Sequence, residues 1–172
     1  MNLNQNHFEI FGLPVRFAVD PAQLESRFRD LQREVHPDRY AASSQAEHRV
    51  SMQLATRVNE AFQTLKSPVS RARYLLHLHG VDPQLETNTA MPQDFLVGQM
   101  ELREALDDAM DAEDGSRLAQ LSSQLRRDRD ALLGQLEARL EAQAWNEAAE
   151  VLRQLMFVEK FGEEIGAAED RL

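Results

Sequence analysis

The 172-residue chain contains no cysteine, which excludes disulfide bonds, thiolate metal sites and cysteine nucleophiles. Seven glycines and 6% aromatic residues are typical of a helical chain more than of a β-rich one. No apolar run approaches the ~20 residues that a membrane span needs. The opening sequence MNLNQNHFEI lacks the basic and apolar regions of a signal peptide. We therefore expect a cytoplasmic protein that does not act on a membrane.

Charge is unevenly distributed along the sequence. Residues 1–80 contain ten Lys or Arg against eight Asp or Glu, a balance of +2, whereas residues 81–172 contain nine against twenty-one, a balance of −12. Together they give the net charge of −10. Such a split indicates two modules with different partners. The acidic half argues against nucleic-acid binding, because that requires cations to neutralise phosphates.

Almost every long segment has the period of a helix, and none has the period of a strand. Asp20 and Pro21 suit the N-cap and first position of one helix, and Pro37 ends it because the residue before a proline avoids the α region. One side of this helix is apolar, with Leu24, Phe28, Leu31 and Val35.

Five further helices are predicted, and the predicted fold class is all-α. A helical hairpin comes first and an antiparallel three-helix bundle follows, with the proline-containing residues 81–93 as the linker. The further helices are expected over residues 44–66, 71–79, 94–112, 116–142 and 145–170. The second helix carries Val50, Leu54, Val58, Phe62 and Leu65 on one face. The fifth has a near-heptad seam of Leu118, Leu121, Leu125, Leu132, Leu136 and Leu140.

The sequence RFRDLQREVHPDRY brings a basic helix to an abrupt corner at His36, Pro37 and Asp38. Because Pro37 fixes a sharp stop, the two polar side chains should project from a rigid corner. Arg29 and Arg33 lie four residues apart on the side of the helix opposite the apolar stripe. A solvated helix face is the simple interpretation, but a basic face that leads into the corner also suits docking to an acidic surface.

Taken alone, the corner is also compatible with an ordinary helix end and turn. A metal site is a poor alternative because His36 and Asp38 have no third ligand nearby. A metal hydrolase would need a metal ion at His36. A catalytic dyad would need a nucleophile and an oxyanion signature, and neither is present. We expect no catalytic group, no bound metal and no cofactor.

The order of segments resembles a J-domain, the module by which co-chaperones engage Hsp70 chaperones. The resemblance covers HFEIFGLP, the basic helix, HPD and the long helix that ends VNEAFQTLKSP, over about residues 7–66. The glycine- and phenylalanine-rich linker and the zinc region of common J-proteins are missing. Instead, SPVSRARYLLHLHG and FLVGQMELREALDD are similar to the HscB family, the J-type co-chaperones of bacterial iron–sulfur cluster assembly. Arg39 stands where many J-domains have lysine, which keeps the charge.

This resemblance implies that residues 1–80 form a J-domain that engages the ATP-bound form of a specialised Hsp70. Contact through His36, Pro37 and Asp38, with Arg29 and Arg33 beside them, would stimulate ATP hydrolysis by the partner. Residues 94–172 would bind the iron–sulfur cluster scaffold protein and present it to the chaperone. The alternative is a general J-protein that presents unfolded chains to Hsp70.

The helix expected over residues 94–112 has two apolar faces. Its core stripe contains Phe95, Leu102, Leu106, Ala109 and Met110. Off this stripe lie the apolar Leu96, Val97 and Met100, interleaved with the acidic Glu101, Glu104 and Asp108. An apolar patch ringed by carboxylates is typical of a protein-binding surface, although packing on the neighbouring helix or on the J module would also explain Leu96 and Val97.

The family resemblance implies that this acidic-rimmed face binds the scaffold protein, together with Phe157 on the last helix. Phe157 lies off the stripe of Trp145, Ala149, Leu152 and Met156, so we expect it to be exposed. Carboxylates can also bind a hard cation, but no loop fixes their geometry here.

Overall fold

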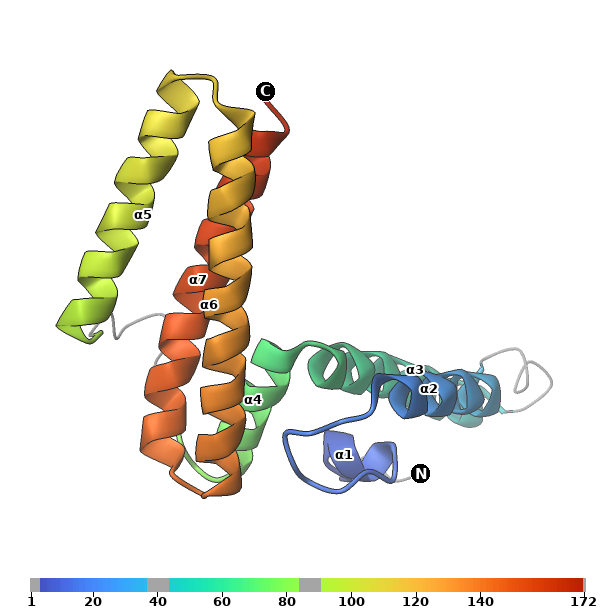
Figure 1. The fold of residues 1–172 in the computed structure, drawn as a ribbon. Coiled ribbons are helices and arrows are strands. Elements are labelled where there is room, and N and C mark those ends of the chain that lie inside the picture. The colour runs from blue at the N-terminus through green and yellow to red at the C-terminus, as the bar shows by residue number, and fades with distance from the viewer. Residues whose placement is uncertain (1–3, 37–43, 84–90, 172) are drawn as a thin grey trace. The chain divides into compact units, whose positions relative to one another are not determined.

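The computed structural model describes residues 4–36, 44–83 and 91–171. These residues form seven helices and no strand, so the predicted all-α class is confirmed (Figure 1). The helices are α1 (His7–Ile10), α2 (Pro21–Val35), α3 (Gln45–Lys66), α4 (Pro68–Leu78), α5 (Gln93–Asp111), α6 (Gly115–Glu141) and α7 (Trp145–Glu169). No helix in these ranges is both long and apolar enough to cross a membrane. The chain divides into two compact units, Met1–Leu78 and His79–Leu172, and each is described separately.

Capping residues set where the long helices of the first unit begin. Asp20 accepts hydrogen bonds from two backbone N–H groups in the first turn of α2. Ser44 and Glu47 form a capping box at the start of α3. Helix α4 starts at Pro68, three residues earlier than predicted, because proline fits the first position of a helix.

The hairpin of α2 and α3 is held by side chains that meet across it. Phe28 stacks on Phe62 with ring centroids 3.9 Å apart. Nearer the end of α2, the Ser51 hydroxyl donates a hydrogen bond to the Val35 carbonyl. Residues of α3 that precede Ser51 therefore extend beyond the last turn of α2. For this reason Val50 is 47% exposed, although it was placed on the same helix face as the buried Val58 and Leu65.

A short helix near the N-terminus, α1, has no counterpart among the predicted elements. Its four residues are too few to show a helical period. The His7 ring stacks on Tyr74 of α4 at 4.2 Å, and the His7 backbone N–H donates to the Tyr74 hydroxyl at 3.1 Å. Burial and the neighbouring Arg57 lower the pKa of His7, which favours the neutral ring in this stack.

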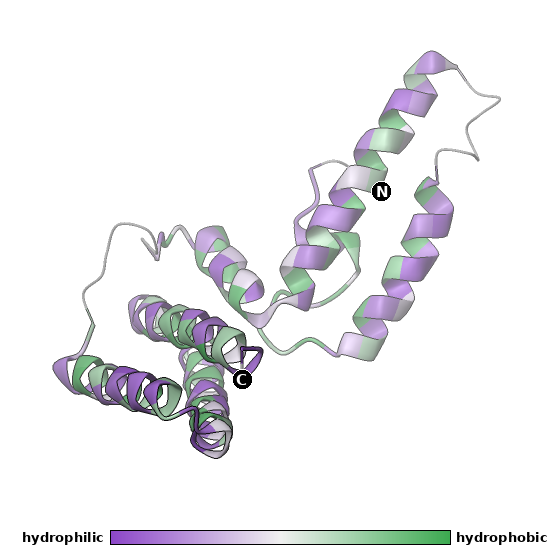
Figure 2. Cartoon of the chain, turned by 90° about the horizontal axis from the view of Figure 1, so that it is seen from above, coloured by the Kyte–Doolittle hydropathy of each residue, from purple (hydrophilic) through white to green (hydrophobic). Residues whose placement is uncertain are grey.

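The second unit is built on α6 and α7, which pack against each other along their lengths (Figure 1). All six leucines of the near-heptad seam of α6 are buried, as a seam that packs in a helical bundle requires. Helix α5 packs on both α6 and α7, but among its described residues only Leu106 and Ala109 are fully buried. Figure 2 shows hydrophilic and hydrophobic residues alternating along each helix, as amphipathic helices require.

The segment before α5 also contacts α7. His79 stacks on Trp145 with centroids 3.9 Å apart, and Arg153 donates a hydrogen bond to the Pro83 carbonyl at 3.1 Å. Residues 79–83, which directly follow α4, therefore pack against α7 of the second unit.

Both turns of the second unit end their helix in the same way. At the end of α6, Gln143 donates to the Leu140 carbonyl at 3.2 Å and Ala144 donates to the Arg139 carbonyl at 2.9 Å. This pair of bonds is a Schellman motif, which places one residue in the left-handed region. That residue is Gln143 with φ 57°, a conformation that favours glycine.

Replacing Gln143 by glycine is expected to stabilise the second unit by about 0.5–1 kcal/mol, because glycine adopts a positive φ without the Cβ penalty. The control is the same substitution at Gln135, which lies inside α6 and is exposed. There, glycine should destabilise the unit by about 0.5–1 kcal/mol. Thermal and urea unfolding measure both changes in the free energy of unfolding. If both variants shifted it in the same direction, this account of the turn would be contradicted.

Candidate functional site

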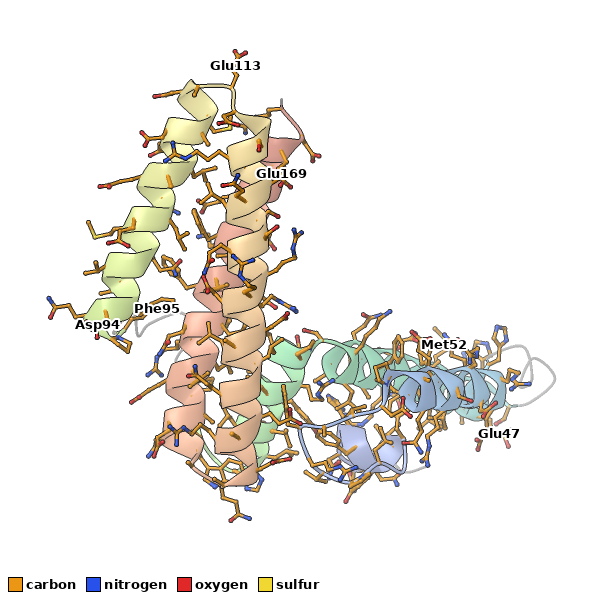
Figure 3. The ribbon with its side chains drawn as sticks, viewed as in Figure 1. Glu47, Met52, Asp94, Phe95, Glu113 and Glu169 are labelled. Atoms are coloured by element: carbon orange, nitrogen blue, oxygen red, sulfur yellow. The ribbon has the colours of Figure 1, made fainter. Side chains whose placement is uncertain are left out.

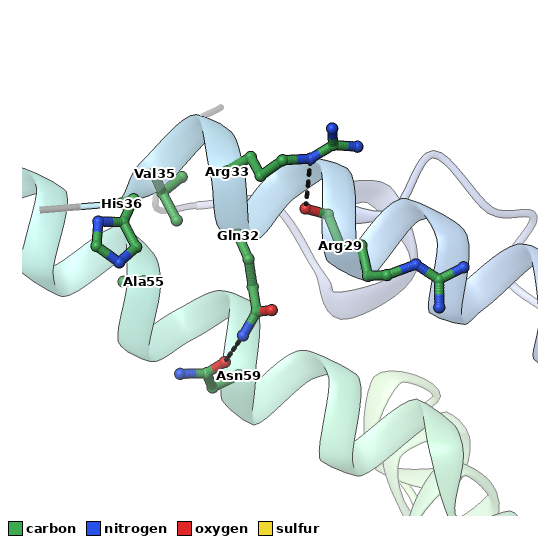
Figure 4. Close-up of a pocket in the computed structure, with 7 residues that line it drawn as sticks. All are labelled: Arg29, Gln32, Arg33, Val35, His36, Ala55 and Asn59. Carbon is green, nitrogen blue, oxygen red and sulfur yellow. Dashed lines mark hydrogen bonds between the residues drawn. The ribbon is translucent and has the colours of Figure 1, made fainter. Parts of the chain in front are cut away.

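An open groove runs between the last turns of α2 and the facing side of α3. The residues that line it are Arg29, Gln32, Arg33, Val35, His36, Ala55 and Asn59 (Figure 4). Gln32 donates a hydrogen bond to the Asn59 side chain at 3.5 Å, which links the two walls. The structure thus brings together three of the residues that the sequence singled out: Arg29, Arg33 and His36.

His36 caps the C-terminus of α2 and is exposed. Its backbone is extended, with φ −62° and ψ 128°, so the chain leaves the helix axis at this residue. An extended residue before a proline is the expected conformation. The other two residues of the predicted corner, Pro37 and Asp38, lie outside the described residues.

The basic side of α2 carries a carboxylate that the sequence analysis did not consider. Arg33 forms an ion pair with Asp30 three residues earlier, and its Nε donates to the Arg29 carbonyl at 3.4 Å (Figure 4). Both partners of the pair are mostly exposed, so the pair itself adds little stability. Its effect is to hold the Arg33 side chain along the helix and to offset part of the positive charge.

Helix α5 presents three exposed apolar side chains near its start. The exposed fractions are 40% for Leu96, 47% for Val97 and 65% for Met100. They lie on the side of α5 opposite Leu106 and Ala109, which are buried against the other two helices. We call Leu96, Val97 and Met100 the α5 patch.

The acidic residues predicted beside the α5 patch are all exposed, but they differ in their surroundings. Glu101 lines a shallow groove between α5 and α6. Asp108 lies 3.6 Å from the guanidinium of Arg117 on α6, which offsets its charge. The carboxylate of Glu104, between them on the same side of the helix, has no ion pair among the described residues.

Phe157 is less exposed than its position off the α7 stripe predicts. It is half-buried, because Phe95 at the start of α5, which is labelled in Figure 3, packs edge-to-face against it with ring centroids 6.0 Å apart. The contact joins α7 to the end of α5 that carries the patch. The expectation of a simply exposed side chain was wrong, since helix geometry alone does not show what a neighbouring helix covers.

No group of three or more His, Asp or Glu side chains that could hold a metal ion is found in residues 4–36, 44–83 and 91–171. The carboxylates near the α5 patch follow one helix face, and no loop gathers their oxygens around a point. Asp38 lies outside these ranges.

A helical hairpin with an exposed histidine corner, joined to a second helical unit with an apolar patch, has the organisation of a J-type co-chaperone. A family model described as the HscB C-terminal oligomerisation domain matches residues 91–166. A protein of Burkholderia mallei strain SAVP1, named Co-chaperone protein HscB homolog, is 49% identical over 172 residues, which cover 100% of this chain and 98% of that protein.

Two solved structures are similar to this chain over nearly its whole length. Chaperone HscB from Vibrio cholerae has a TM-score of 0.87 and 37% identity, covering 98% of this chain and 99% of that one. The human co-chaperone protein HscB has a TM-score of 0.91 and 31% identity, covering 100% of this chain and 86% of that one. The chain belongs to the HscB family, the J-type co-chaperones of iron–sulfur cluster assembly.

Proposed function

We propose that the first unit engages the ATP-bound form of a specialised Hsp70 and stimulates its ATPase through the groove between α2 and α3. The observation that carries this proposal is that Arg29, Arg33 and His36 line one open groove at the end of α2. Pro37 and Asp38 complete the contact in this proposal. The chemistry of ATP hydrolysis belongs to the partner, so this chain acts in the cytoplasm as an activator and not as an enzyme.

The groove suits a partner with an acidic docking surface. Exposed guanidinium groups attract carboxylates over roughly 8–10 Å at moderate ionic strength, and this attraction steers the encounter. The arginines then fix the register of α2 on the partner, and His36 meets the chaperone at the point where the helix stops. Steering and activation are therefore assigned to different residues of one surface.

The second unit binds the iron–sulfur cluster scaffold protein through the α5 patch in this proposal. The patch and the half-buried Phe157 supply apolar area, and Glu101, Glu104 and Asp108 form a charged rim that favours a basic partner surface. Because patch and groove belong to different units, the chain can hold chaperone and scaffold protein together and deliver one to the other.

His36→Gln is expected to abolish stimulation of the Hsp70 ATPase, because the imidazole is the exposed group at the helix end. The variant should stay within about 0.5 kcal/mol of the wild-type stability, as exposed polar substitutions usually do. A single-turnover ATPase assay measures the effect. His77→Gln is the matched control, since His77 is exposed on α4 away from the groove. Normal stimulation by His36→Gln would refute the assignment.

The double variant Arg29→Ala and Arg33→Ala is expected to weaken chaperone binding about 2- to 30-fold, from about 0.2–1 kcal/mol for each exposed charge pair. Wild-type affinity should fall between about 0.05 M and about 0.5 M salt, and the variant should be less sensitive. Arg126→Ala with Arg127→Ala on α6 removes the same charge elsewhere and should have little effect. An affinity independent of salt would count against a basic docking surface.

Leu96→Ala with Met100→Ala is expected to weaken scaffold binding at least about tenfold, because exposed apolar residues at the centre of a patch carry much of the binding energy. The free energy of unfolding should change by less than about 1 kcal/mol. Leu106→Ala, on the buried side of α5, should cost roughly 2–5 kcal/mol. A binding titration and a thermal melt give the two values. Phe157 is left unchanged in this pair, because its packing on Phe95 would mix stability with binding.

The competing function is that of a general J-protein, and the same titration distinguishes it. A dedicated scaffold site binds the folded scaffold protein and ignores unfolded hydrophobic peptides. A general site binds many such peptides, and Leu96→Ala with Met100→Ala would weaken all of them alike.

A further inference from the structure

Ser51 differs from the other polar residues of this structure. It is 2% exposed, and among the described residues no other polar or charged side chain is buried to this degree. Its hydroxyl donates a hydrogen bond of 2.8 Å to the backbone carbonyl of Val35 on the neighbouring helix. Hydroxyls inside a helix usually bond to their own helix four residues back. In α3 the Thr56 hydroxyl donates such a bond to the Met52 carbonyl at 3.0 Å. Ser51, in the same helix, instead bonds to a neighbouring helix.

The acceptor is the carbonyl of the last residue of α2. A helix leaves its final carbonyl groups without partners from the next turn, and α2 stops here because a proline follows His36 in the sequence. The Val35 side chain is itself buried at 4% exposure. Packing therefore fixes the Val35 side chain, and the hydrogen bond from Ser51 fixes the backbone carbonyl of Val35.

The same carbonyl belongs to the peptide group that joins Val35 to His36. A peptide group is planar, so fixing its oxygen and the Cα of Val35 restricts the plane and with it the Cα of His36. We propose that Ser51 is a positioning residue, whose hydrogen bond to the Val35 carbonyl sets the direction in which His36 leaves α2 toward the chaperone. The functional part of this inference rests on the proposed role of His36, whereas its structural part does not.

The mechanism separates docking from activation. Arg29 and Arg33 lie earlier on α2, and the Ser51 bond does not involve them. Loss of the hydroxyl should leave the docking side of α2 in place while His36 samples other directions. The expected signature is a lower maximal ATPase stimulation at nearly unchanged half-saturating concentration, which a general loss of fold would not produce.

The test compares Ser51→Ala with Val58→Ala in the full-length chain. Val58 is fully buried in the same helix and outside the groove, so its truncation destabilises the unit without touching Val35. Ser51→Ala should lower maximal stimulation roughly 5- to 100-fold, the range that a small misplacement of an acting group produces. Its half-saturating concentration should stay within about twofold. Val58→Ala should keep wild-type stimulation below its melting temperature.

Nuclear magnetic resonance of the free protein supplies a readout that needs no chaperone. In Ser51→Ala, the Val35 carbonyl carbon and the His36 amide and imidazole signals should shift or broaden, while the His77 imidazole signals stay in place. Unmoved His36 signals, or an equal loss of stimulation in Val58→Ala, would overturn the positioning role. Failure of the wild-type chain to stimulate any Hsp70 would instead overturn the proposed function, and the resonance comparison would still decide whether Ser51 orients His36.

Discussion

Each helix of this chain must bury one apolar stripe against its neighbours, and this constraint determines which side chains remain for partners. In the second unit, α6 satisfies it with six leucines that all point inward. Helix α5 satisfies it with fewer residues and carries three further apolar side chains on the opposite side. Among the described residues of this unit, α6 and α7 cover the side of α5 that carries Leu106 and Ala109, and the patch side is exposed. In the proposed function, this exposed side of α5 is the surface that binds a partner.

The two candidate surfaces are opposite in charge and differ in how they are held. The groove of the first unit has two arginines on α2, and one of them, Arg33, forms an ion pair with Asp30 on the same helix. The α5 patch is flanked by carboxylates, one of them offset by Arg117. An acidic chaperone surface and a basic scaffold surface would each be repelled from the other unit's site. In the proposed function, charge complementarity would thus direct each partner to its own unit.

Much of this architecture is predictable from the sequence because local signals and burial agree. Asp20 with Pro21 marks the start of α2, and the leucine spacing predicts the buried side of α6. The burial of some individual side chains is not predictable from the sequence, because it depends on how far each helix extends past its neighbour. Val50 has the right spacing for the core, but α2 ends before reaching it. Phe157 lies off its stripe, but Phe95 comes from another helix to cover it. Similarly, a serine near the start of α3 gives no sequence signal that its hydroxyl bonds to the last carbonyl of α2.

The groove and the α5 patch depend on different physical quantities, and this difference sets how each tolerates mutation. In the proposed mechanism, activation depends on the direction of one peptide plane, so loss of the Ser51 hydroxyl would disable it while the area of the surface stays the same. A patch depends on apolar area spread over several side chains, and its rim only excludes water and selects charge. Single changes should weaken the patch by degrees. In the proposed function, the first unit needs a rigid anchor behind His36, which the bond between Ser51 and Val35 would supply. The second unit would need only a well-packed helix beneath its patch.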